Sequence, residues 1–136
     1  MKSRDTLIRL KKFQVDEKRR QVAQLEGMIA EFERMASELD QQIQSEQQKA
    51  GIHDAAHFAY PTFAKAAMVR KENLITSADG LKVQLEAARA ALSEAFDELK
   101  KIELLDERDR EAEKSLNAVR EQAELDETAG RQAFQG

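Results

Sequence analysis

The fold is decided by one short stretch of sequence, GIHDAAHFAYPT, at residues 51–62. Gly51 suits the end of a helix, because glycine readily adopts the left-handed backbone conformation that terminates many helices. Pro61 is the one proline of the chain. It disfavours helical geometry at Tyr60 and suits the first turn of a following helix. We therefore predict a single turn at residues 50–62, with a long helix on each side of it.

The sequence before this turn has the apolar repeat of a coiled coil. Every a position of a seven-residue repeat is apolar: Ile8, Val15, Val22, Ile29, Ala36 and Ile43. The d positions hold Lys11, Lys18, Leu25, Phe32, Leu39 and Glu46, of which the middle three are apolar. Such a repeat gives a helix one continuous apolar seam. We predict a helix over about residues 3–49, whose seam the early lysines weaken.

The sequence after the turn carries a second apolar repeat. Two sets of positions lie three or four residues apart: Leu85, Leu92 and Leu99, and Leu74, Leu81, Ala88, Ala95 and Ile102. Beyond residue 105 the repeat fails, and acidic side chains occupy positions that should be apolar: Asp106, Asp109 and Glu113. We predict a helix over about residues 63–127. Residues 128–136 have no periodicity, so we expect a frayed tail there.

Charge and hydrophobic period agree on how the two helices pair. Residues 1–20 hold eight basic and three acidic side chains, whereas residues 92–111 hold eight acidic and four basic ones. If the numbers of facing residues add to about 112, Ile8 meets Leu104 and these two segments lie side by side. Agreement between independent patterns is expected of a specified fold. We predict an all-α fold, a single antiparallel coiled-coil hairpin over residues 1–136.

The same register leaves the second helix longer than the first by about fifteen to twenty residues, a C-terminal helical overhang of roughly 25 Å. Apolar side chains occur in the overhang among many charges: Leu116, Val119, Ala123 and Leu125. The first helix has no residues left to cover them. We predict that the overhang is either disordered in the free protein or bound to a partner.

Composition excludes several classes of protein. Charged side chains make up 35% of the chain and aromatic ones only 5%, which is typical of long helices and leaves too few large side chains for a thick core. The absence of cysteine excludes disulfides, thiolate metal sites and a cysteine nucleophile. No stretch approaches the ~20 apolar residues that span a bilayer, and the N-terminus lacks a secretory signal. We expect a soluble protein without direct membrane insertion.

The sequence offers no convincing catalytic, metal or cofactor site. His53 and His57 lie four residues apart with Asp54 close by, which is the minimum for a metal site. Two incidental histidines in a solvated turn are the favoured interpretation. No glycine-rich phosphate loop or catalytic serine context occurs, and the many carboxylates are interpreted as solvated helix surface. We expect a protein that is not an enzyme.

The basic N-terminal segment does not predict nucleic-acid binding. It lacks stacking aromatics, and the whole chain has a net charge of −4. In the hairpin register an acidic helix also neutralises the segment. Its basic residues are spread around the helix, which argues against a membrane-surface site as well.

The aromatic side chains in and beside the turn leave two interpretations open. Phe58, Tyr60 and Phe63 lie within six residues of one another. They either cap the end of the coiled coil or form an exposed anchor for a partner, since aromatics are over-represented among binding hot spots.

Three segments make the chain similar to a known family: the basic and apolar opening LIRLKKF (7–13), the turn HFAYP (57–61) and the ending EQAELDE (121–127). Between them lie one long Gln- and Glu-rich helix, a break and a second long helix. In this the chain resembles the flagellar export protein FliJ family, in the form found in alpha-class bacteria. The resemblance covers nearly the whole chain, and the turn and the ending are its most specific parts.

The resemblance implies a non-enzymatic cytoplasmic component of the flagellar type III export apparatus, at the cytoplasmic face of the basal body, that supports flagellar assembly and motility. Family members are similar in shape to the central stalk of rotary ATPases. The implied partners are the hexameric export ATPase, the cytoplasmic domain of the export gate, and export chaperones. The implied ATPase-facing residues are Arg9, Lys11, Lys12, Leu116, Val119 and Leu125, and the gate-facing residues are Phe58, Tyr60 and Phe63.

Two alternatives remain open at this point. The first is a general coiled-coil chaperone or scaffold for export substrates, with no ATPase contact. The second is a homo-oligomeric structural coiled coil, in which each helix pairs with a helix of another copy.

Overall fold

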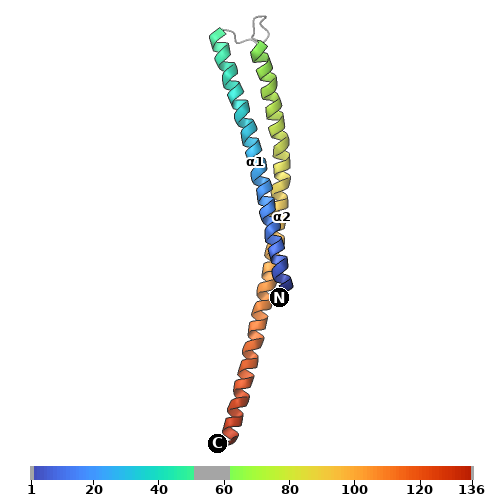
Figure 1. Ribbon diagram of the computed structural model, residues 1–136, viewed down its shortest axis with the longest axis vertical. Helices are drawn as coiled ribbons and strands as arrows, with labels where there is room; N and C mark the ends of the chain where they lie inside the picture. Colours follow the sequence, from blue (N-terminus) through green and yellow to red (C-terminus); the bar gives the residue numbers. More distant parts are fainter. Residues whose placement is uncertain (1, 51–61, 136) are drawn as a thin grey trace. The chain divides into compact units, whose positions relative to one another are not determined.

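The computed structural model describes residues 2–50 and 62–135, and all of them are helical. Helix α1 is Lys2–Ala50 and helix α2 is Thr62–Gln135 (Figure 1). The predicted all-α fold with two long helices packed against each other is confirmed. The predicted turn at residues 50–62 lies, apart from its two end residues, outside the described part of the chain.

Helix α2 continues further than the sequence pattern predicted. Residues 128–135 are helical, where a frayed tail was expected. No proline interrupts this segment, and the single glycine, Gly130, costs a helix only about 1 kcal/mol relative to alanine. The Arg131 guanidinium lies 2.8 Å from the Glu127 carboxylate, one turn earlier, which supports the helix locally. Helical propensity therefore carries α2 past the last apolar repeat.

The chain divides into two units. The middle unit is Gln14–Glu94, and the terminal unit combines Met1–Phe13 with Ala95–Gly136. Each unit therefore contains a part of α1 and a part of α2.

The middle unit holds most of the buried apolar side chains of the described residues. They are Val15, Ile29, Ala36 and Ile43 from α1, with Ala64, Ala67, Ala78 and Leu85 from α2. The four residues from α1 are predicted a positions, and the fifth a position of this unit, Val22, is half-buried. Three of the four residues from α2 are alanines, whose small side chains let the two backbones approach closely. The predicted seam of the first helix is confirmed in this unit.

Ion pairs across the two helices show the register of the middle unit. Lys71 Nζ donates to Asp40 Oδ1 at 2.7 Å, Lys82 Nζ lies 2.9 Å from Glu33 Oε1, and Arg89 Nη2 lies 3.2 Å from Glu26 Oε1. Partners late in α1 meet residues early in α2, so the helices are antiparallel. In each pair the two residue numbers add to within a few of 112, the value predicted from the hydrophobic and charge patterns.

The terminal unit keeps the same register but buries fewer apolar side chains. Lys11 Nζ donates to Glu98 Oε2 at 3.0 Å, and Arg4 pairs with Asp109. The predicted pairing of the basic start with the acidic 92–111 segment is therefore present as side-chain ion pairs. Among the described residues of this unit, Leu99 is the one buried apolar side chain.

Candidate partner-binding surfaces

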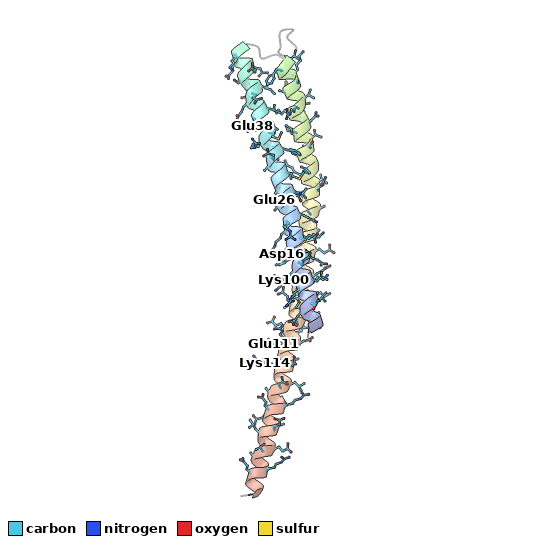
Figure 2. All side chains as sticks on the ribbon, in the orientation of Figure 1. Asp16, Glu26, Glu38, Lys100, Glu111 and Lys114 are labelled. Carbon is cyan, nitrogen blue, oxygen red and sulfur yellow. The ribbon has the colours of Figure 1, made fainter. Side chains whose placement is uncertain are left out.

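Beyond Arg110, the described side chains of α2 form a long exposed stretch of the terminal unit. Among the described side chains of α1, Arg4 and Asp5 pair with Asp109 and Arg110, and α2 then runs on to Gln135. Figure 1 shows this red part of α2 extending beyond the first turns of α1, which belong to the same unit, and Lys114, labelled in Figure 2, lies on it. Every described side chain from residue 107 to residue 133 is exposed. The C-terminal overhang predicted from the register is therefore present, and it is helical.

The overhang presents apolar side chains to solvent among charged ones. Leu116, Val119 and Leu125 are 50%, 66% and 64% exposed. Leu116 and Val119 lie three residues apart, and with Ala112 and Ala123 they form one stripe at helical spacing. Leu125 points to a different face of the helix, because it lies two residues from Ala123. The stripe is the part of the overhang that a partner helix or groove would cover.

The three basic residues predicted for the ATPase-facing end have different surroundings. Lys11 packs at a seam position, where its side chain is only 22% exposed, and it pairs with Glu98. Arg9 and Lys12 are exposed. Together with residues of both helices they line a shallow hollow of the terminal unit, whose other walls are Asp5, Ile8, Glu103, Asp106, Glu107 and Arg110. Arg9 and Lys12 are accessible to a partner, whereas Lys11 contributes to the pairing of the helices.

Exposed apolar side chains on the first turns of α1 extend this surface. Leu7, Leu10 and Phe13 are 40%, 50% and 59% exposed. The sequence indicates that Leu10 and Phe13 are exposed, because they occupy the c and f positions of the heptad, which point away from a single partner helix. The N-terminal turns therefore combine basic and apolar groups on their outer side.

The predicted tip site is described only in part. Phe58 and Tyr60 lie outside the described residues, as do His53, Asp54 and His57. Phe63 lies in the first turn of α2 and is 52% exposed. Met68 and Val69 are exposed further along the same helix. An apolar surface on the first turns of α2 is compatible with the anchor interpretation, which stays a prediction.

Exposed ion pairs of the middle unit shift pKa values without marking a reactive site. A hydrogen bond from Arg34 lowers the pKa of the Glu31 carboxyl, desolvation opposes this shift, and the charge of Arg34 adds a smaller lowering. A hydrogen bond to Glu33 raises the pKa of Lys82, and Asp79 adds to the shift. In both cases the charged form is favoured at neutral pH, so these groups act as ion pairs on the helix surface.

The described part of the chain contains neither a metal-binding cluster nor a membrane-spanning helix. No group of three or more His, Cys, Asp and Glu side chains within residues 2–50 and 62–135 is arranged to hold a metal ion. Over the same residues, no helix is both long and apolar enough to cross a membrane. The surfaces described above are faces of the two helices.

Comparison with known proteins gives one match. A family model described as flagellar FliJ protein matches residues 1–136, the whole chain. No curated protein and no solved structure matches it.

Proposed function

Because the chain belongs to the flagellar FliJ protein family, it is a component of the flagellar export apparatus, and we propose that it acts there as a stalk-like, non-enzymatic coiled coil. In this proposal the terminal unit binds the hexameric export ATPase. The first turns of α2, with Phe63, contact the cytoplasmic domain of the export gate. The protein works at the cytoplasmic face of the flagellar base, is held near the membrane by these partners, and assists export chaperones.

One observation carries the proposal: a helix of about seven turns continues past the paired region with an exposed apolar stripe. Among the described residues of the terminal unit, Leu116 and Val119 stay 50% and 66% exposed. A lone helix in water gains little stability from propensity alone, so its apolar face is best satisfied by a partner. A single helix is also about 10 Å wide with its side chains, which suits insertion between the subunits of a protein ring.

The charge of the overhang indicates the chemistry of the partner. Residues 111–135 hold six acidic and three basic side chains. Arg9 and Lys12, on the outside of the adjacent α1 turns, contribute basic charge to the same unit. The proposal therefore requires a binding surface on the ATPase ring with both basic and acidic groups around an apolar centre.

Truncation after Arg110 tests this function. The deleted residues are exposed throughout their described part, so the midpoint of thermal unfolding should change by no more than about 2 °C. Binding to the purified export ATPase, measured by pull-down and by stimulation of ATP hydrolysis, should fall at least about tenfold. The double variant Leu116→Gln and Val119→Gln should reproduce the loss without shortening the chain.

A matched control replaces two exposed apolar residues of the middle unit, Ile75→Gln and Val83→Gln. These changes should leave ATPase stimulation intact. Full stimulation by the chain truncated after Arg110 would refute the proposed contact. If the truncated chain still binds export substrates and the intact chain does not bind the ATPase, the alternative of a general coiled-coil chaperone is supported.

A further inference from the structure

A buried carboxylate lies in the apolar seam of the terminal unit. Leu85, Leu92 and Leu99 repeat every seven residues along α2, and the next position of the series is Asp106. Asp106 is only 8% exposed and is the one buried charged residue of the described chain. Its Oδ2 atom lies 3.0 Å from Nε of Arg110, one turn later on the same helix. The leucine series of α2 therefore ends on a charge that is paired within its own helix.

Further ion pairs connect this position to the first turn of α1. Arg110 Nη2 donates to Asp5 Oδ1 at 3.4 Å, so one guanidinium bridges Asp5 on α1 and Asp106 on α2. Arg4 Nη1 pairs with Asp109 and also lies 3.4 Å from the backbone oxygen of Leu105. Each cross-helix ion pair within this group involves a residue of the first turn of α1. These five side chains, Arg4, Asp5, Asp106, Asp109 and Arg110, are here called the ionic clasp.

Apolar burial contributes little at this end of the pairing. Within the terminal unit, the described residues include one buried apolar side chain, Leu99, with Ile8, Ala95, Phe96 and Ile102 half-buried. The middle unit buries eight. Apolar burial is insensitive to screening, whereas ion pairs between exposed groups weaken as salt shortens the Debye length from about 10 Å at 0.1 M to about 3 Å at 1 M. Asp109 and Arg110 are both more than half exposed.

We propose that the ionic clasp is a salt-sensitive set of ion pairs. When these pairs are weakened, the first three turns of α1 separate from α2 while the middle unit stays paired. Separation exposes the face of α2 that carries Leu99, Ile102 and Asp106. This face and the overhang then form one longer exposed surface on a single helix. A charged partner surface that competes for Arg4 and Arg110 has the same effect as added salt. The inference concerns the free chain and does not depend on the proposed ATPase contact.

Distance measurement between two spin labels tests the clasp in the full chain. The protein has no cysteine, so the pair Leu7→Cys and Leu105→Cys can be labelled selectively, and both sites are exposed and uncharged. On raising NaCl from about 0.1 M to about 1 M, the fraction of molecules at the short distance should fall at least about threefold. A second pair in the middle unit, Ser37→Cys and Thr76→Cys, should keep its short distance under both conditions.

The variant Asp106→Leu distinguishes the clasp from general fraying of a helix end. Leucine continues the series of Leu85, Leu92 and Leu99, so the short distance should persist at about 1 M NaCl. Asp97→Leu makes the same substitution at an exposed position of the same unit, and it should retain the salt response of the parent. An unchanged short-distance fraction in the parent at high salt would overturn the proposal. Equal separation in the parent and in the Asp106→Leu protein would overturn it as well.

Discussion

Polar residues at seam positions show how single side chains are accommodated between the two helices. Lys71 lies in the seam of α2 and donates to Asp40, and Lys11 lies in the seam of α1 and donates to Glu98. Both lysine side chains are partly buried, and each places its ammonium group against a carboxylate of the other helix. Among the described residues, no buried side-chain nitrogen or oxygen lacks a hydrogen-bond partner. Polar residues in the seam therefore lower the stability of the helix pair only a little, and they favour one register of the two helices.

Charge reversal at Arg9 and Lys12 is the residue-scale test of the ATPase contact. Both side chains are exposed, so the double change to Glu should leave helicity and thermal stability close to those of the parent. Stimulation of the export ATPase should fall at least about fivefold, because rim charges steer association. The matched control is Lys65→Glu with Arg70→Glu on exposed sites of the middle unit, and it should stimulate normally. Lys11 is left unchanged, since its reversal would break the pair with Glu98.

The Glu31–Arg34 pair makes stability depend on pH. Arg34 lowers the pKa of Glu31 below its ordinary value of 4.5, so the stabilisation is present above pH 4.5 and is lost as pH falls through the lowered pKa. Glu31→Gln should therefore lower the midpoint of thermal unfolding at pH 7, and the difference from the parent should vanish near about pH 2. Glu124→Gln, at an exposed site of the overhang, should show no such pH-dependent difference. A difference that persists at acid pH would contradict the assignment.

At the scale of the element, the two helices differ in what stabilises them. Helix α1 buries or half-buries a regular seam along the middle unit, and its Met and Leu residues beside the seam are half-buried or exposed. Helix α2 is paired only up to about Arg110 and then depends on propensity and on local pairs such as Arg131–Glu127. Because local pairs of this kind are weak, the overhang should be the first part of α2 to exchange its amide hydrogens.

Glycines inside the helices are sites where stability can be gained. A Cβ atom added to Gly27 or Gly80 would meet no atom within 4 Å, and both residues are helical. Gly80→Ala should raise the free energy of unfolding by about 0.5–1 kcal/mol, measured by urea titration followed by circular dichroism. Gly130→Ala is equally free of clashes but lies in the overhang, so it should raise helicity without moving the main transition. A loss of stability on Gly80→Ala would show a contact at that position.

At the scale of the whole molecule, pairing of the two helices within one chain distinguishes a hairpin from an assembly of several chains. Lys71 pairs with Asp40 within the middle unit, and Lys11 pairs with Glu98 within the terminal unit. In each pair, a residue of α1 contacts a residue of α2 of the same chain. Sedimentation equilibrium at about 5–50 μM should therefore give a monomer whose helicity does not depend on concentration. Helicity that falls on dilution, together with a dimer or tetramer mass, would favour the homo-oligomeric coiled coil instead.

Much of this fold could be predicted from the sequence, because its determinants are local or periodic. The apolar residues at every seventh position predicted which face of α1 is buried, as Val15, Ile29 and Ile43 confirm. Opposite charges at the two ends predicted the register now seen in Arg4–Asp109. An antiparallel pair of helices has few degrees of freedom once seam and register are known, so pattern alone suffices.

The tertiary structure decided what each residue in the pattern does. Lys11 and Lys12 are neighbours of like charge in the sequence, but one lies in the seam against Glu98 and the other faces solvent. Asp106 breaks the leucine series, and only the packed helices show that it is buried and bridged through Arg110 to Asp5. Periodicity determines which face of a helix turns inward. Burial and ion pairing depend on the atoms supplied by the other helix, and these are far away in the sequence.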